Sequence, residues 1–149
     1  MDQVFVYKTA LALCDKLSEL EAAIDHTVTA ETIVKMLPIH SETCPYCVSF
    51  NQICSKDCRY GALHGYCNDD GSTWRKLCGG AIIMETDEIV GFCERTKIRE
   101  ICSKYTRILS KDQYTMDVNT LMGYKKIILA EIAQQLKYNQ VFLEALEAY

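Results

Sequence analysis

The feature that most constrains this chain is a run of six cysteines that separates two stretches of helical periodicity. The spacing is C-x2-C-x6-C-x3-C-x8-C-x10-C, at Cys44, Cys47, Cys54, Cys58, Cys67 and Cys78. Between residues 39 and 80 the apolar residues follow neither a helical nor a strand period, and turns such as Asn68-Asp69-Asp70-Gly71 indicate compact loops. A stretch of about forty residues without regular structure rarely stays ordered inside a domain unless something fastens it.

The short cysteine spacings favour a bound metal as that fastening. Two cysteines separated by two residues, such as Cys44 and Cys47, direct both sulfurs toward one ion. Zinc takes four cysteine or histidine ligands, and iron–sulfur clusters also use cysteine thiolates at short spacings. We therefore expect zinc, with a 4Fe-4S cluster as the alternative. The candidate ligands are Cys44, Cys47, Cys54, Cys58, Cys67, His64 and Cys78.

The spacing leaves the exact ligand set open. There are more than four candidates, which fits one metal with a spare thiol or a two-metal site. The opening C-x2-C-x6-C also matches the first half of fungal binuclear zinc clusters, but the second half departs from them. Cys-Pro-Tyr-Cys at residues 44–47 looks like the glutaredoxin motif. That chemistry needs a βαβ context and a second, downstream proline, and the only prolines here are Pro38 and Pro45.

The cysteine spacing also resembles that of uncharacterised small cysteine-rich proteins of bacteria and their phages. The resemblance covers residues 44–74, and Cys54 and Cys58 are separated by three residues where two are more usual. The matching residues are Cys44-Pro45-Tyr46-Cys47, Cys54, Cys58, Cys67, Ser72 and Trp74. The resemblance implies a cysteine-rich ligand site without implying a reaction.

Composition and charge exclude several classes of protein and of cellular location. A chain of 149 residues with 49% hydrophobic residues can bury an ordinary core, so its nine cysteines are not needed as a disulfide scaffold. Charged residues such as Asp2 and Lys8 interrupt the N-terminal apolar residues, and no apolar run is long enough to span a membrane. We expect a cytoplasmic protein. The net charge of −4 argues against nucleic-acid binding.

The segments on either side of the cysteines are predicted to be helical. Residues 3–38 carry one apolar stripe, and Thr29 is placed to cap a second short helix, Ala30 to Leu37, that Pro38 ends. The N-terminal stripe consists of Val6, Ala10, Leu13, Leu17, Leu20 and Ile24. Ala81–Met84 is the only plausible strand, and it reads equally well as helix.

From about Thr86 the chain is predicted to be helical again, with Ile98, Ile101, Tyr105 and Ile108 on one face. Ser110 and Gln113 resemble a capping box that opens the next element. The longest predicted helix runs from Val118 to Ala148. Its stripe contains Leu121, Tyr124, Ile128, Ile132, Leu136, Leu143 and Leu146. This broad face needs more than one neighbour, either within the chain or in a homodimer.

The sequence thus predicts a single, mainly α domain spanning residues 1–149. A helical, bundle-like core is formed by residues 1–38 and 81–149, and an irregular metal-binding knuckle, residues 39–80, is inserted between them. Cys14, Cys93 and Cys102 are expected to be small buried apolar groups, although Cys93 and Cys102 are also considered as additional cluster ligands.

No catalytic arrangement stands out in the sequence. We expect a protein-interaction or regulatory module, with Tyr60, Tyr66 and Trp74 contacting another protein. An iron–sulfur protein with a redox or enzymatic role is the alternative.

Overall fold

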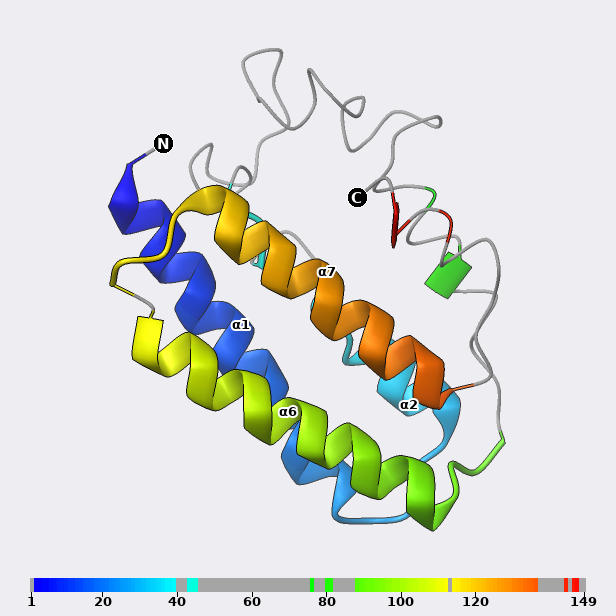
Figure 1. Cartoon of the computed structure of the whole chain (residues 1–149). Coiled ribbons are helices and arrows are strands. Elements are labelled where there is room, and N and C mark those ends of the chain that lie inside the picture. Colours follow the sequence, from blue (N-terminus) through cyan, green and yellow to red (C-terminus); the bar gives the residue numbers. More distant parts are fainter. Residues whose placement is uncertain are drawn as a thin grey trace.

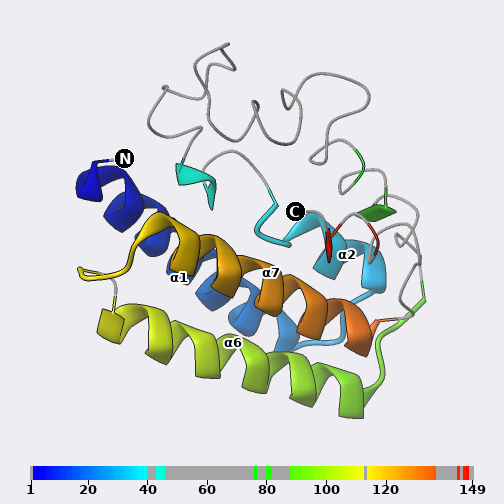
Figure 2. The ribbon, with the colours of Figure 1, turned by 45° about the horizontal axis from the view of Figure 1, so that its top comes forward.

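Three long helices, packed side by side, form the body of the protein. The computed structural model describes residues 2–39, 43–45, 76, 80–81, 88–112, 114–136, 144 and 146–147. Within these residues the named helices are α1 (Gln3–Ile24), α2 (Ala30–Lys35), α6 (Phe92–Asp112) and α7 (Val118–Gln135). Helix α6 runs antiparallel to α1 and α7, and α2 lies near the C-terminal half of α7 (Figures 1 and 2). The mainly helical prediction is confirmed for the described residues.

Helices α1 and α2 form where the sequence places them. All six residues of the predicted N-terminal stripe are buried, each at most 2% exposed. Thr29 caps α2 as predicted, because its hydroxyl oxygen accepts a hydrogen bond from the Thr32 amide at 3.3 Å. The helix ends at Lys35, two residues before the predicted end. Pro38 disfavours helical geometry in the residue that precedes it, which accounts for an early stop.

Helix α6 begins at Phe92, later than the predicted start near Thr86, because the preceding residues pair with another segment. Ile89 forms an isolated antiparallel bridge with Thr29. The Ala30 amide donates to the Glu88 carbonyl and the Val90 amide donates to the Val28 carbonyl, both at 3.0 Å. Residues 88–90 are therefore extended, and this pairing ties the start of α6 to the start of α2.

The buried face of α6 is rotated from the predicted one. Ile98 and Tyr105 are buried as expected, but Ile101 and Ile108 are only partly buried. Cys102 and Leu109 take the central positions instead, at 0% exposure each. Apolar side chains occupy both candidate faces of this helix, so periodicity alone did not separate them.

Helix α7 has different ends from those predicted. Ser110 lies inside α6, and the cap of α7 is Asp117, whose carboxylate accepts from the Thr120 amide at 2.7 Å. The predicted single helix from Val118 to Ala148 is also wrong. Helix α7 stops at Gln135, because Leu136 adopts an extended conformation (φ −91°, ψ 166°) that cannot continue the helical hydrogen bonds.

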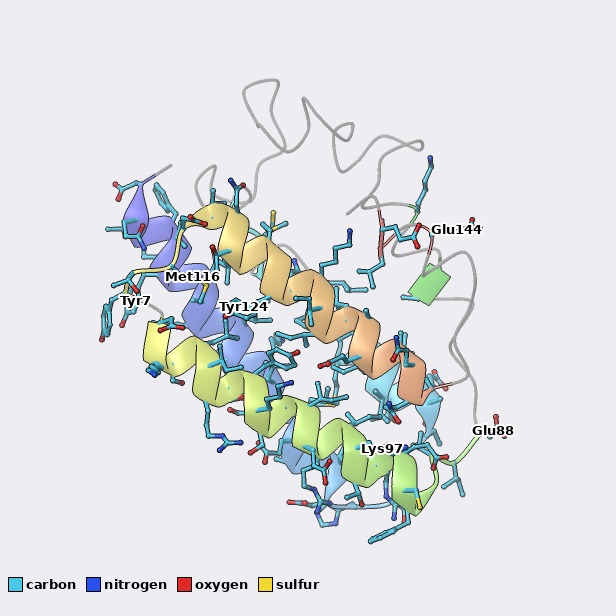
Figure 3. All side chains as sticks on the ribbon, viewed as in Figure 1. Tyr7, Glu88, Lys97, Met116, Tyr124 and Glu144 are labelled. Atoms are coloured by element: carbon cyan, nitrogen blue, oxygen red, sulfur yellow. The ribbon has the colours of Figure 1, made fainter. Side chains whose placement is uncertain are left out.

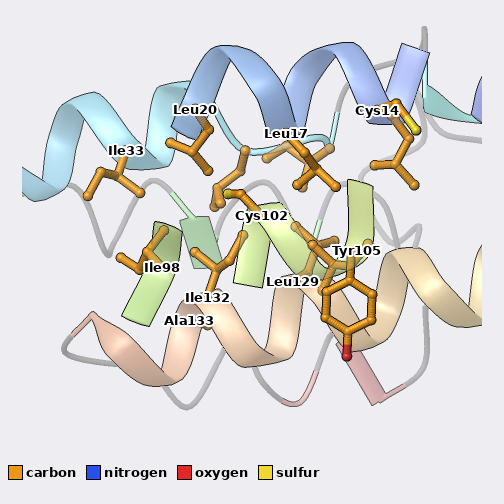
Figure 4. Close-up of a cluster of buried hydrophobic side chains, with 14 of the residues drawn as sticks. Cys14, Leu17, Leu20, Ile33, Ile98, Cys102, Tyr105, Leu129, Ile132 and Ala133 are labelled. Carbon is orange, nitrogen blue, oxygen red and sulfur yellow. The ribbon is translucent and has the colours of Figure 1, made fainter. Parts of the chain in front are cut away.

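One apolar core joins the four helices (Figure 4). Leu17 and Leu20 of α1, Ile98 and Cys102 of α6, and Leu129 and Ile132 of α7 are all buried in it. Helix α7 contacts both α1 and α6, so its broad face has more than one neighbour within the chain. The homodimer stays a prediction. Among the described residues no helix is long and apolar enough to cross a membrane.

Replacing Ile98 with alanine should lower the free energy of unfolding by about 2–5 kcal/mol, because the substitution leaves a cavity in the core. Ile127→Ala is the matched control, since Ile127 is 47% exposed on α7 and its truncation should change stability by less than about 0.5 kcal/mol. Urea denaturation followed by circular dichroism measures both. Equal losses in the two variants would contradict the described packing.

Candidate metal centre

Cys44 is the one predicted metal ligand that lies within the described residues. Its side chain belongs to a buried segment, and Cys44 itself is 7% exposed. Thr43 and Pro45 on either side of it are buried as well. The remaining predicted ligands lie outside the described residues: Cys47, Cys54, Cys58, His64, Cys67 and Cys78.

A buried lysine fastens this segment to the helical core. Lys125 lies in the middle of α7, is 1% exposed, and donates from its Nζ to the Thr43 carbonyl at 3.2 Å. The Thr43 hydroxyl donates in turn to the Pro38 carbonyl at 2.9 Å, which folds the chain back on itself just before Cys44. One buried hydrogen bond thus holds the start of the cysteine-rich region on α7, and a second one fixes the turn within that segment.

Sequence reasoning did not single out Lys125. The signal was available: Lys125 lies four residues after Leu121 and three before Ile128, which places it on the apolar stripe of α7. Its neighbour Lys126 points elsewhere and donates to the Glu147 carbonyl. A lysine within the apolar stripe of a helix indicates a buried ammonium group that has a partner at that position.

The far end of the cysteine-rich region also attaches to the core. Ala81 is helical, 2% exposed and part of the apolar core. A few residues later, Glu88 and Val90 pair with the segment ahead of α2. The helical body therefore holds the chain near both ends of the cysteine-rich region.

Two of the remaining thiols are structural, as predicted. Burial raises the pKa of the Cys14 thiol, and it raises the pKa of Cys102 to about 12, with a smaller contribution from the charge of Glu21. Cys102 packs in the core between α1 and α7 (Figure 4). Because a metal ligand must be a thiolate, this environment disfavours Cys102 as an additional ligand.

The prediction that Cys93 is buried is wrong. Cys93 is exposed in the first turn of α6, beside Phe92, which is 73% exposed. This turn precedes the part of α6 that packs in the core, because the first buried residue of α6 is Ile98.

An open groove of about 280 Å³ lies between α6 and α7. Its lining residues are Lys97, Glu100, Ile101, Lys104, Glu131, Gln134 and Gln135. Figure 3 shows Lys97 near the start of α6. The Glu131 Oε2 atom is buried and has no hydrogen-bond partner among the described residues. Burial and a hydrogen bond to Glu131 raise the pKa of Tyr105, beside the groove, to about 12. Because both charge signs line the groove, it does not indicate one class of ligand.

Comparisons with known proteins do not assign the site. No protein-family model, curated protein or solved structure matches the chain. Within the described residues, no group of three or more histidine, cysteine, aspartate or glutamate side chains is placed to hold a metal ion. The features of the chain that bear on a metal centre are therefore the cysteine spacing and the buried position of Cys44.

The thiols of the native protein should differ sharply in reactivity. At pH 8 a thiol with a pKa of about 12 is ionised in roughly one molecule in ten thousand, so buried Cys102 should react far more slowly than exposed Cys93. Brief labelling with a maleimide, followed by peptide mass spectrometry, measures both sites in one sample. Equal labelling in the folded protein would be inconsistent with this structure, whereas equal labelling in urea is the expected control.

Proposed function

We propose that this protein binds a metal ion, with zinc favoured, through its cysteine-rich region, and that the metal-bound region acts as a protein-interaction or regulatory module. The observation that carries the proposal is the density of ligands in the sequence, where five cysteines and His64 fall between Cys44 and Cys67. Thiolates at such short spacings suit tetrahedral zinc.

The physical role of the metal follows from the composition of the region. Residues 39–80 contain too little apolar periodicity to form a core of their own. At a structural zinc site the binding energy is folding energy, so bound metal compensates for a missing core. The buried position of Cys44 and the bond that holds the neighbouring Thr43 to α7 support this view, since they fix the backbone of one proposed ligand.

An interaction role is supported by the aromatic residues of the same region. Tyr60, Tyr66 and Trp74 lie among the cysteines in the sequence, although outside the described residues. Aromatic side chains on a rigid loop are effective anchors for a protein partner. The groups that a hydrolase or transferase needs do not form a recognisable motif in the sequence.

An iron–sulfur cluster is the second candidate, and the excess of thiols favours it. Six cysteines but only one histidine lie between Cys44 and Cys78. Cluster sites commonly use four cysteine thiolates and no histidine. Visible absorption of anaerobically purified protein separates the candidates, because an iron–sulfur protein is coloured and a zinc protein is colourless. A coloured, iron-containing protein would replace the interaction role with a redox or enzymatic one.

Cys44→Ser should lose most of the bound metal, and it should destabilise the metal-loaded protein by several kcal/mol, because serine is a poor zinc ligand. Cys14→Ser is the matched control. It exchanges a buried thiol for a hydroxyl in the core, which should cost about 1–3 kcal/mol and leave the metal in place.

Elemental analysis and thermal melts of both variants, purified in parallel, make this comparison. Retention of the same metal content by Cys44→Ser and Cys14→Ser would show that Cys44 is not a ligand.

A further inference from the structure

The exposed side of α6 carries a row of basic side chains between residues 97 and 111. Their positions recur at helical spacing, so they share one face of the helix, turned away from its buried face. Helix α6 lies at the edge of the three-helix body, which leaves this face exposed (Figure 1). Glu100 is the one acidic residue among them. The basic face of α6 consists of Lys97, Lys104, Arg107 and Lys111, all of which are exposed.

The cations of the basic face are not paired within the described part of the chain. On another side of the same helix, Arg99 does have a partner, since its Nη2 atom lies 2.9 Å from Asp25 Oδ1. None of the four residues of the basic face forms such an ion pair with a described residue. Lys104 lies instead over the ring of Tyr105, with its Nζ atom 5.0 Å from the ring centroid. The positive charge of this face is therefore available to a partner.

The stability of the helix accounts for one of these four positions. Lys111 lies in the last turn of α6, where a cation interacts favourably with the helix dipole. The other three lie further from that end, where this effect is absent. Because the whole chain has a net charge of −4, the basic face is a local reversal of charge. A local reversal of this kind attracts and orients a partner of opposite charge.

The neighbouring helix does not neutralise the basic face. Glu131 is the one acidic residue of α7, and it lines the groove between the two helices together with Lys97 and Lys104. Arg107 and Lys111 lie outside that groove. The exposed residues of α7 are all uncharged: Asn119, Thr120, Gly123, Ile127 and Gln134.

The spacing of the cations indicates the shape of the partner. Lys97, Lys104 and Lys111 follow one another at intervals of seven residues, which is about 10 Å along the helix axis. A second helix with an acidic residue at every seventh position presents its charges at the same interval, as the charged flanking positions of coiled coils do. An extended segment presents side chains on one side about every 7 Å and does not match this interval.

We propose that the basic face of α6 docks an acidic helix of a partner protein. The contact is made by ion pairs between exposed side chains, so salt in the solution weakens it. The negative net charge of the chain opposes binding to a nucleic acid, which carries a dense negative charge of its own. The basic face belongs to the helical body and needs no bound metal, so this interaction goes beyond the proposed function.

An NMR titration of the nitrogen-15-labelled full-length protein tests the proposal. The probe is a synthetic alanine-rich helical peptide with a glutamate at every seventh position, and the control peptide has glutamine at those positions. Shifts of backbone amides should concentrate at residues 97–111 with the glutamate peptide, and its affinity should fall as the salt concentration rises. The glutamine peptide should cause no shifts.

Arg107→Glu should lower the affinity for the glutamate peptide at least about fivefold, because an attraction becomes a repulsion. Lys8→Glu is the matched control. It changes the net charge by the same amount at an exposed position of α1 and should leave the affinity within about twofold of wild type, since solvent and salt screen a distant charge. Circular dichroism shows whether each variant keeps its helices. If Arg107→Glu does not, Lys97→Glu makes the same comparison at the other end of the face.

Three results would overturn the proposal: no shifts on α6, equal affinity in Arg107→Glu and Lys8→Glu, or equal binding of the two peptides. Tighter binding to a single-stranded RNA oligonucleotide or to phosphatidylserine vesicles than to the glutamate peptide would also overturn it, because the face would then serve another class of partner. The titration does not depend on bound metal. Its failure leaves the proposed metal-binding function standing, and absence of metal leaves this proposal standing.

Discussion

The packing of α6 against α1 and α7 forms the centre of the described helical body. Cys102 and Leu109 of α6 are completely buried, and their neighbours in the core come from the other helices. Loss of one such side chain costs about 2–5 kcal/mol, whereas an exposed ion pair such as Arg99–Asp25 contributes about 0–1 kcal/mol. The core therefore sets the register of α7, and the ion pairs on the surface adjust it little.

The register of α7 in turn places Lys125, and Lys125 holds the segment that contains Cys44. In the structure Lys125 donates to the Thr43 carbonyl and Lys126 donates to the Glu147 carbonyl. Rotation of α7 by one residue would exchange the positions of these two side chains. The position of the first predicted ligand thus depends on a helix that is far from it in the sequence. The helical body holds the chain at Thr43 and again at Ala81, near the two ends of the cysteine-rich region.

Much of the helical body was predictable from the sequence, for physical reasons. The α1 stripe repeats at helical spacing with polar residues opposite, and Thr29 is a strong cap signal, so both predictions are confirmed. The buried face of α6 was harder to predict, because apolar residues also lie on the neighbouring face of this helix. No proline or glycine marks the end of α7, so its break at Leu136 carried no local signal. The sequence predicts the candidate ligand residues, whereas the buried bond from Lys125 to Thr43 depends on the packing of α7 and could not be predicted.

The most direct test of the account is the metal content of the wild-type protein purified anaerobically without added metal. Native mass spectrometry, combined with elemental analysis, gives the identity and the number of metal ions on each chain. The account predicts at least about one equivalent of zinc, or one iron–sulfur cluster, per chain. Less than about a tenth of an equivalent of either metal, with all nine cysteines titrating as thiols in the unfolded protein, would contradict it.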